Sequence, residues 1–374
     1  MNISCLQENL SAALSIVRSG IGKESGLPIL STILFRAEGK LLYLNTTNLE
    51  IAVQCSVRGK VEEEGSVALP AKTFLDFISL LPKEKIELKT GSDSLVTLTC
   101  GSYRTKIHGL APDEFPLIQT PENGVVIRCA QSVFKKALSS AGHAAASQET
   151  RPELHGVYFS WGASQKKAVC VGTDAYRLSE KIFTIKGPED TNISCIIPLR
   201  TVQELSRSIL SDDEQECEVA ITETQVCVRT ETVECISKVV QGAFPDYQSI
   251  IPQNFHTRAI VHCDELGRAV KATSLFSRGG LNDVVCRLEP TDGTHGLVTL
   301  SSANAAIGEN TVSLDAEITG GENSITINYR YLLDGLSHVE SDTVSLSVVD
   351  TQSPCVIRPV GKDDFTYLIM PIRE

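Results

Sequence analysis

The sequence predicts an α+β protein built from three copies of one domain, each with two helices and mainly antiparallel sheet. Two observations support this prediction: short phrases that recur three times, and a regular succession of helical and strand-like hydrophobic patterns. At 374 residues the chain is too long for a single hydrophobic core, and domains of about 125 residues are of ordinary size. A repeat this long indicates a triplicated domain rather than a solenoid.

Three phrases recur in a constant order along the chain. One opens a helix, one is a polar turn, and one places a proline after an apolar residue. Their first residues are Pro70, Pro198 and Tyr329 for the helix phrase, Thr47, Thr173 and Ala303 for the turn phrase, and Phe115, Phe244 and Met370 for the proline phrase. From this order we expect three domains, at residues 1–122, 123–253 and 254–374.

Six stretches carry apolar residues at the i, i+3/i+4, i+7 spacing of an amphipathic helix, which gives two helices per repeat. Their apolar stripes are Leu6, Leu10, Ala13, Leu14 and Val17; Phe74, Phe77, Ile78 and Leu81; Val133, Phe134, Ala137, Leu138 and Ala141; Val202, Leu205 and Ile209; Leu266, Val270 and Thr273; and Leu332, Leu336 and Val339. Short alternating segments between them, such as 95–99, 168–171, 226–229 and 344–348, predict strands.

Composition narrows the class of protein. No apolar run is long enough to span a membrane, and the N-terminus lacks a basic region followed by an apolar stretch, so we expect a cytoplasmic protein. The twelve cysteines occur singly, without a Cys-x-x-Cys motif, and mostly within strand-like runs. They are expected to be small buried apolar residues in a reducing compartment, with disulfides as the alternative.

The charge is distributed unevenly. The formal net charge is −12, whereas the six predicted helices sum to about +4, which leaves about −16 on sheets and loops. One interpretation is ordinary charge scatter on solvated faces. The other is a mildly basic helical face that surrounds a polyanion without gripping it.

No catalytic or cofactor motif is complete. The segment 20–25 resembles a phosphate loop but has Val17 and Glu24 where that motif needs glycine and a hydroxyl residue. The histidines are not at metal-ligand spacing with any cysteine, so no metal or cofactor is expected. Asp174 with Tyr176 and Arg177 either forms a polar turn between strands or, in the alternative hypothesis, works with a nearby histidine in a cytosolic hydrolase or transferase.

Four motifs match a known family in the right order: 27–30 (LPIL), 173–178 (TDAYRL), 244–247 (FPDY) and 370–373 (MPIR). Along its whole length the chain resembles the β subunit of bacterial DNA polymerase III, the replicative sliding clamp. The resemblance implies three DNA-clamp domains and a head-to-tail homodimer closed into a ring. Such a ring encircles duplex DNA without sequence specificity and tethers the polymerase as a non-catalytic processivity factor for DNA replication.

A rough calculation agrees with this ring. Twelve helices at ~9 Å between axes give a ring of axes about 110 Å around and ~35 Å across. Subtracting a helix thickness of ~10 Å leaves a hole of about 24 Å, which passes a B-form duplex and some water. The tether would then be topological, which reconciles an acidic chain with a DNA partner.

The resemblance also implies a pocket for short peptide motifs of partner proteins: the DNA polymerase III α subunit, the clamp loader, and other polymerases and repair proteins. The family's pocket corresponds here to Leu154, Thr173, Ala175, Tyr176, Arg177, Leu178, Pro245, Ile250, Pro354, Leu368, Met370 and Ile372. Mostly apolar side chains with one arginine suit a peptide that bears leucine or phenylalanine anchors. For Leu154, Leu178, Ile250 and Leu368, the alternative is a plain core position.

Two further surfaces are implied by the resemblance. The residues expected to face DNA are Lys23, Lys72, Gln148, Arg151, Arg200 and Arg207. The residues expected at the dimer interface are Ile107 on one protomer and Leu275 and Phe276 on its partner. The chain departs from the family at Ala175-Tyr176, where Gly-His is usual, and at its Arg373-Glu374 end, where an apolar residue is common.

Overall fold

The computed structural model describes the whole chain apart from residues 23–26, 117–118, 122, 149, 163–165 and 374. The chain divides into two compact units. Unit 1 contains residues 1–135 and 185–240, and unit 2 contains residues 136–184 and 241–374. The middle third of the chain therefore contributes to both units. Among the described residues, no helix is both long and apolar enough to cross a membrane.

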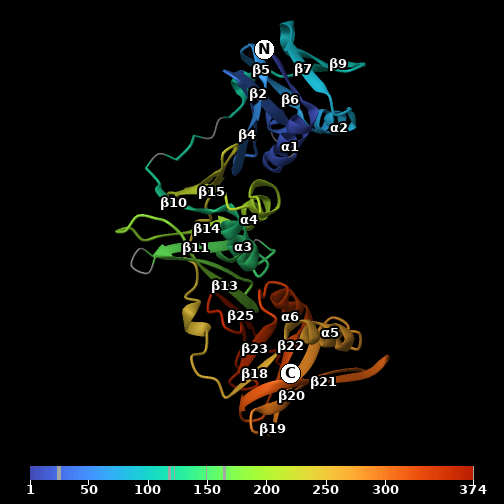
Figure 1. Cartoon of the computed structure of the whole chain (residues 1–374), viewed down its shortest axis with the longest axis vertical. Helices are drawn as coiled ribbons and strands as arrows, with labels where there is room; N and C mark the ends of the chain where they lie inside the picture. The colour runs from blue at the N-terminus through green and yellow to red at the C-terminus, as the bar shows by residue number, and fades with distance from the viewer. Residues whose placement is uncertain (23–26, 117–118, 122, 149, 163–165, 374) are drawn as a thin grey trace. The chain divides into compact units, whose positions relative to one another are not determined.

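Unit 1 contains the helices and strands of the N-terminal third of the chain together with part of the middle third (Figure 1). Its elements are β1 (Asn2–Leu6), α1 (Gln7–Val17), β2 (Thr32–Glu38), β3 (Leu41–Thr47), β4 (Ile51–Arg58), β5 (Lys60–Glu63), β6 (Gly65–Pro70), α2 (Ala71–Leu80), β7 (Lys85–Thr90), β8 (Leu95–Cys100), β9 (Tyr103–His108), β10 (Val125–Ala130), β14 (Ile193–Pro198), α4 (Leu199–Glu204) with a π-helical turn (Leu205–Ile209), β15 (Glu216–Ile221), β16 (Gln225–Arg229) and β17 (Val233–Lys238).

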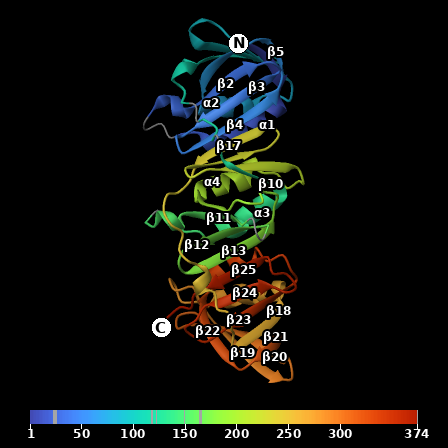
Figure 2. The same cartoon turned by 90° about the vertical axis from the view of Figure 1, so that its left-hand side faces the viewer.

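Two antiparallel sheets organise unit 1. One has the strand order β5-β1-β7-β8-β9, and the other has the order β10-β15-β16-β17-β4-β3-β2-β6. Strand β17 pairs with β4, with Glu234 opposite Gln54 and Ile236 opposite Ala52. Figure 2 shows these two strands side by side. A strand from the middle of the chain thus extends the sheet of the N-terminal repeat, and we call this pairing the first joint.

Unit 2 holds the C-terminal third of the chain and three strands of the middle third. Its elements are β11 (Gly156–Gly162), β12 (Lys167–Thr173), β13 (Arg177–Thr184), β18 (Thr257–His262), α5 (Cys263–Ser274), β19 (Asp283–Asp292), β20 (His295–Asn304), β21 (Gly308–Gly320), β22 (Asn323–Asn328), α6 (Tyr329–Leu336), β23 (Thr343–Val348), β24 (Cys355–Pro359) and β25 (Phe365–Ile369). The chain passes from unit 1 to unit 2 within α3 (Gln131–Gly142).

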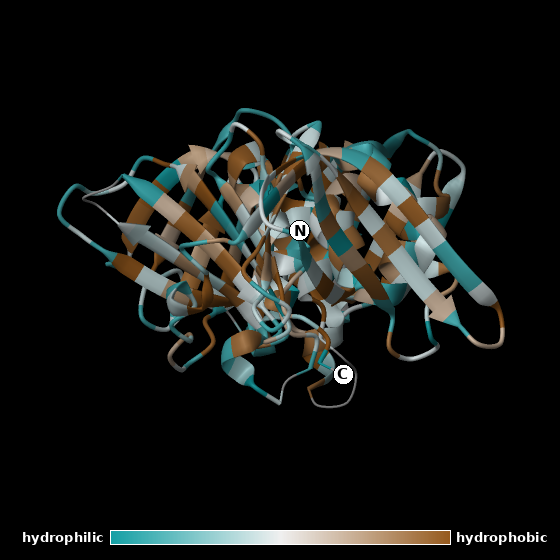
Figure 3. Ribbon diagram, turned by 90° about the horizontal axis from the view of Figure 1, so that it is seen from below, coloured by the Kyte–Doolittle hydropathy of each residue, from teal (hydrophilic) through white to brown (hydrophobic). Residues whose placement is uncertain are grey.

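The strands of unit 2 follow the order β11-β12-β13-β25-β24-β23-β18-β21-β20-β19-β22. Here β13 pairs antiparallel with β25, with Arg177 opposite Ile369 and Leu178 opposite Leu368. This second joint links the middle and C-terminal repeats by backbone hydrogen bonds, as the first joint links the first two repeats. Hydrophobic and hydrophilic residues alternate along many strands, as expected when one face of a sheet is buried (Figure 3).

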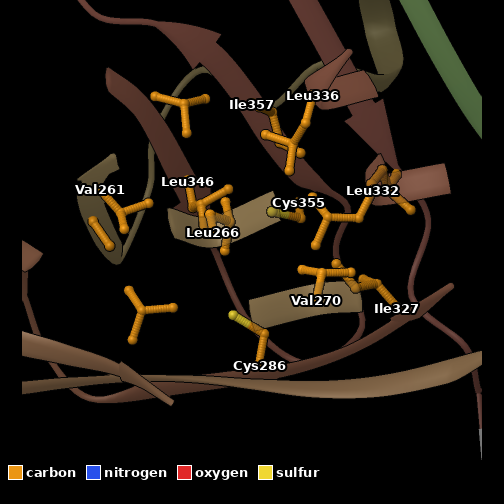
Figure 4. Close-up of a cluster of buried hydrophobic side chains, with 14 of the residues drawn as sticks. Val261, Leu266, Val270, Cys286, Ile327, Leu332, Leu336, Leu346, Cys355 and Ile357 are labelled. Atoms are coloured by element: carbon orange, nitrogen blue, oxygen red, sulfur yellow. The ribbon is translucent and has the colours of Figure 1, made fainter. Parts of the chain in front are cut away.

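Helices α5 and α6 lie side by side and cover one face of the C-terminal sheet (Figure 1). Their buried stripes, which include Leu266, Val270 and Leu332, meet strand residues such as Cys286 and Ile357 in one hydrophobic cluster (Figure 4). The N-terminus of α6 is capped because Oδ1 of Asn328 accepts from the backbone N–H of Arg330 at 2.9 Å. Burial of this cluster, rather than helix propensity alone, fixes the two helices.

The predicted class and the six helices are confirmed, with corrections at the helix ends. Leu6 belongs to β1 and is 55% exposed, so it is not part of the stripe of α1. Leu81 and Val339 follow the ends of α2 and α6. All twelve cysteines lie in the described parts of the chain, and every one except Cys263 is buried. None of them is in a disulfide, which was the alternative that the sequence left open.

Candidate functional site

The turn between β12 and β13 is held by its own side chains. Oγ1 of Thr173 donates to the carbonyl oxygen of Arg177 (2.6 Å) and accepts from the N–H of Ala175 (3.1 Å). Oδ1 of Asp174 accepts from the N–H groups of Tyr176 (2.9 Å) and Arg177 (3.0 Å). Ala175 adopts φ +74°, a left-handed conformation that costs a residue with a Cβ. The Asp174 carboxylate is thus a turn-forming group, as the structural interpretation predicted.

The equivalent turn in the first repeat has the same hydrogen bonds. Thr47 Oγ1 donates to the carbonyl oxygen of Ile51 (3.1 Å) and accepts from Leu49 N–H (3.0 Å). Asn48 Oδ1 accepts from the N–H groups of Glu50 (3.0 Å) and Ile51 (2.8 Å). Leu49 has φ +74°, the same value as its counterpart. The recurring turn phrase therefore marks a true structural repeat.

Arg177 is the best-connected side chain of the predicted pocket. Its Nε donates to Asp174 Oδ2 (3.0 Å) and its Nη1 donates to Asp334 Oδ2 (2.6 Å). Its guanidinium lies over the ring of Tyr331, 4.5 Å from the centroid. Burial alone would lower the pKa of Arg177, but Tyr367, Asp334 and Asp174 outweigh it and hold that pKa above its ordinary value. The side chain is a fixed cation that is only 12% exposed.

An apolar cluster lies beside this turn. Its buried members are Val171, Leu178, Tyr247, Val356 and Leu368, and its partly buried members are Tyr158, Val169, Phe244, Ile251, Phe255 and Met370. The rings of Tyr158 and Phe244 stack with centroids 5.0 Å apart. Tyr247 donates its hydroxyl to Glu180 Oε2 (2.8 Å), and burial followed by the Glu180 charge raises the pKa of Tyr247.

The C-terminal segment runs past this cluster. Met370 donates its backbone N–H to the carbonyl oxygen of Tyr176 (2.8 Å), and Ile372 donates to the carbonyl oxygen of Thr326 (2.8 Å). All twelve predicted pocket residues belong to unit 2. Leu154, Thr173, Leu178 and Leu368 are buried; Arg177, Pro354, Met370 and Ile372 are half-buried; Ala175, Tyr176, Pro245 and Ile250 are exposed. The alternative of a plain core position therefore fits Leu154, Leu178 and Leu368. It does not fit Ile250, which is 47% exposed.

Sequence reasoning missed four residues around Arg177: Tyr331, Asp334, His143 and His338. The rings of His143 and His338 stack with centroids 4.0 Å apart, and His143 also lies 5.4 Å from the ring of Tyr367. Burial, followed by the neighbouring His338 and Arg177, lowers the pKa of His143 to about 3. The helix phrase at 329–333 was a signal for Tyr331, whereas nothing local to either histidine indicates their contact.

Two of the predicted DNA-facing arginines line one cavity. Arg200 and Arg207, on α4 and its π-helical turn, meet Arg18 around a cavity of about 580 Å³ in unit 1. Arg200 also donates from Nη2 to the carbonyl oxygen of Ser19 (3.3 Å). The rest of the lining is five serines, Ser19 among them, three apolar residues, Asp76 and Glu204. Arg18 was not predicted, and its position at the end of an amphipathic helix was the available signal.

The other predicted DNA-facing residues are more scattered. Lys72 is exposed on α2 in unit 1. Gln148 and Arg151 are exposed in the segment that follows α3 in unit 2. Lys23 lies outside the described residues. Among the described members of the predicted set, the structure therefore groups only Arg200 and Arg207 around one cavity.

The predicted interface residues lie on different units. Ile107 is half-buried on β9 in unit 1. Leu275 follows the last residue of α5 in unit 2 and is 72% exposed, and Phe276 beside it is half-buried. Ile307, in the turn between β20 and β21, is 63% exposed and was not predicted. Leu275 and Ile307 are thus large apolar side chains exposed to solvent in unit 2.

Family comparisons match the chain in three consecutive parts. The DNA polymerase III beta subunit N-terminal domain matches residues 1–119, the central domain matches 128–246, and the C-terminal domain matches 248–373. The beta sliding clamp of Staphylococcus aureus (strain Mu50) is 28% identical over 382 residues, covering 100% of this chain and 99% of that protein. That of Staphylococcus epidermidis is 29% identical over 362 residues, covering 94% of both.

Solved structures of the same family share the fold of this chain. The crystal structure of the DNA polymerase sliding clamp from Bacillus subtilis superposes with a TM-score of 0.94 at 26% identity, covering 100% of this chain and 99% of that one. The DNA polymerase III beta subunit from Thermotoga maritima superposes with a TM-score of 0.91, also at 26% identity and with the same coverage. The groups of His, Cys, Asp and Glu in the described parts of the chain include none arranged to hold a metal ion.

Proposed function

Because the chain belongs to the DNA polymerase III beta subunit family, we propose that two copies close head to tail into a ring around duplex DNA. The chain is a DNA sliding clamp of three clamp domains, and it acts in DNA replication as a non-catalytic processivity factor. The observation that carries this function is the consecutive match of all three family domains along one chain. The hydrolase or transferase hypothesis is therefore wrong.

The proposed domain boundaries are 1–122, 123–253 and 254–374. Each proposed domain contains two of the six helices, which supports this division. The proposed protomer contact joins β9, through Ile107, to the end of α5, through Leu275 and Phe276. Support comes from the exposure of Leu275 and of the unpredicted Ile307. Burying these side chains in the dimer would contribute a few kcal/mol.

Duplex DNA is proposed to pass the basic helical face rather than to be gripped by it. The cavity lined by Arg18, Arg200 and Arg207 supports this, because three guanidinium groups outnumber the Asp76 and Glu204 carboxylates there. Few phosphate contacts make binding weak and steeply dependent on salt, which permits sliding. Lys72, Gln148 and Arg151 are proposed as further contacts, and Lys23 stays a prediction from the sequence.

Partner proteins are proposed to insert a short peptide of the type Gln-x-Leu-x-Leu/Phe beside the turn 173–178. The exposed Ile250 and half-buried Met370 and Ile372 would contact its anchors over the buried Leu178 and Leu368. The proposed partners are the DNA polymerase III α subunit, the clamp loader, and other polymerases and repair proteins. Replication of the chromosome makes the cytoplasm the proposed location.

Topology gives the direct test of this function. The full-length protein is loaded by a clamp loader onto nicked circular DNA, and the complex is separated from free protein by gel filtration. Cutting the circle with a restriction enzyme should release the protein from the DNA, because a ring slides off the ends. Protein that stays bound to the linear DNA, or that never associates with the circle, would contradict the ring.

A further inference from the structure

Two buried thiols face each other across two neighbouring strands in unit 1. Cys129 on β10 lies directly opposite Cys217 on β15 in the antiparallel register, and their Sγ atoms are 3.9 Å apart. The two residues are 7% and 1% exposed. Because a cysteine side chain is short, the backbone ladder itself fixes this contact.

The backbone at this pair matches the geometry of a disulfide. Arg128 exchanges backbone hydrogen bonds with Lys186 (2.8 and 3.0 Å), so its N–H and C=O groups point away from β15. Successive residues of a strand alternate in this respect, so Cys129 and Cys217 form a hydrogen-bonded pair, whose Cα atoms lie about 5.5 Å apart. Disulfides have Cα separations of about 5.5–6 Å. Rotation of the side chains can therefore bring the Sγ atoms to the bonding distance of about 2 Å.

The contact also favours the reactive form of one thiol. A hydrogen bond from Cys129 lowers the pKa of Cys217, although burial acts in the opposite direction. Burial prevails at Cys195 and Cys227 in the same unit, where it raises the pKa of each thiol to about 12. The thiolate is the nucleophile toward peroxides, so Cys217 is expected to react first.

Access to the pair depends on β10. This strand stands at the end of its sheet, where β15 is its neighbour on one side and the isolated Arg128–Lys186 bridge lies on the other. A strand with a full partner on one side only opens locally at a lower free energy than a central strand. Such opening exposes both thiols to a small oxidant.

We propose that Cys129 and Cys217 form an oxidation site at which a hydroperoxide converts two thiols into a reversible disulfide. The Cys217 thiolate attacks one peroxide oxygen, the O–O bond breaks, and the other oxygen leaves with a proton as water or an alcohol. Cys129 then attacks the sulfur of the sulfenic acid, and its proton leaves with the hydroxide as water. Both sulfurs are oxidised, and the peroxide is reduced by two electrons. The reaction is independent of DNA and of peptide binding.

The disulfide closes a loop of particular composition. The chain leaves unit 1 after residue 135 and returns at residue 185, so the two cysteines flank the whole stretch that belongs to unit 2. Linking them closes a loop of roughly 90 residues, which restricts the unfolded chain and so stabilises the folded one. In a reducing compartment such a bond is transient and responds to oxidant.

Peptide mapping tests the proposal on the full-length protein. The protein is reduced, freed of reductant, treated with hydrogen peroxide and unfolded in urea with N-ethylmaleimide, and its digest is analysed by mass spectrometry without reduction. Peptides that contain residues 129 and 217 should be joined, and two of the twelve cysteines should escape alkylation. Dithiothreitol should restore both. The urea midpoint of the oxidised protein should be higher by on the order of 1 M.

Three variants separate the pair from cysteine chemistry in general. Cys129→Ala removes the second thiol, so peroxide should leave Cys217 as a sulfenic acid that dimedone traps. In Cys217→Ala, Cys129 should be oxidised roughly tenfold more slowly than Cys217 is in Cys129→Ala. Cys195→Ala is the matched control, because Cys195 is 9% exposed, which is more than either member of the pair. This control should form the 129–217 disulfide at the wild-type rate.

Several results would overturn the proposal. The pair is not an oxidation site if both thiols stay reduced while peroxide oxidises glutathione in the same solution, or if they reach sulfinic acids without a disulfide. Oxidation of Cys195 as fast as Cys217 would show that exposure, and not the pair, sets the reactivity. Should a variant at 129 or 217 fail to fold, the peptide map of the wild-type protein decides the question alone.

Discussion

The first and second joints of the chain use one backbone design and differ in what it presents. In each, a polar turn with a left-handed residue precedes a strand that pairs with the next repeat. The residue that closes the turn is Ile51 in the first joint, where it is buried, and Arg177 in the second, where it is bonded to two carboxylates. The repeat therefore preserves the turn, while the last side chain of the turn decides whether the surface carries charge.

The surroundings of the joints differ as well. Beside the first joint is a cavity of about 290 Å³ with a mixed lining, which includes the polar Asn45 and Gln54 and the apolar Phe115 and Ile236. Beside the second joint is the aromatic and aliphatic cluster that includes Met370. A peptide with apolar anchors gains free energy only where apolar surface is covered, so the second joint is the suited one.

The largest expected effect concerns the residue before each turn. In the second joint it is Gly172, where an added Cβ would lie 2.0 Å from the carbonyl oxygen of Ala141. In the first joint it is Thr46, which donates its hydroxyl to the carbonyl oxygen of Val17. Gly172→Ala should cost about 3 kcal/mol or more, because backbone must move, whereas Thr46→Ala should cost about 1 kcal/mol. Urea unfolding of both variants checks this, and equal costs would refute the contrast.

The second effect is a dependence of stability on pH, which arises in unit 2. Because the pKa of His143 is lowered to about 3 in the folded protein, the unfolded chain takes up a proton first as pH falls below about 6.5. The contribution of neutral His143 to the free energy of unfolding is therefore fully present above about pH 6.5. It is lost progressively below that pH, by about 2 kcal/mol at pH 5.

Trp161, the single tryptophan and a buried residue of β11 in unit 2, reports this loss. Its fluorescence in urea at pH 7 and pH 5 should show a smaller difference in His143→Phe than in the wild-type protein. If the two proteins lose the same stability on acidification, other groups cause the dependence.

The third effect separates the joints by ligand binding. Met370→Ala removes apolar surface that packs on the cluster of the second joint, and should weaken the peptide roughly five- to tenfold. The matched change at the first joint, Gln54→Ala, should leave affinity unchanged because Gln54 lies in unit 1, whereas the proposed pocket lies in unit 2. Anisotropy titration measures both. An equal loss of affinity in Gln54→Ala would contradict the prediction that the peptide binds at the second joint.

The smallest effect tests whether the two turns are equivalent. Ala175→Gly and Leu49→Gly each relieve a positive φ, and each should raise stability by about 0.5–1 kcal/mol after the entropy of glycine is counted. Urea midpoints should shift upward by similar amounts in the two variants. Destabilisation of either one would show that its side chain contributes packing that outweighs the strain.

The sequence was most informative where structure is local. The turn phrases, the helical stripes and the strand segments depend on neighbours within a few residues, and these predictions are confirmed. The prediction for Leu6 was wrong because its spacing fits the apolar stripe of α1, although Leu6 is the last residue of β1. The Arg177–Asp334 bond could not be predicted because 157 residues separate its partners. The stack of His143 on His338 is equally remote in sequence, and neither residue sits in a motif.

The two joints also explain why the two compact units do not coincide with the repeats along the chain. Strand β17 completes the sheet of the first repeat, and strands β11 to β13 complete that of the third, so the middle repeat is shared. Hydrophobic periodicity identifies such strands but not their neighbours, because pairing across repeats is set by sheet edges rather than by side-chain pattern. The sequence therefore could not predict that each unit combines two separate stretches of the chain.

Joining repeats through main-chain ladders has an evolutionary consequence. A ladder of N–H and C=O groups is the same for almost any side chain except proline, so substitutions at the joints seldom break them. The joints can therefore drift in sequence while their backbone path is retained, in keeping with relatives that share this fold but little of its sequence. The side chains around each joint are then free to diversify, and the recognition role proposed for the second joint alone is in keeping with that freedom.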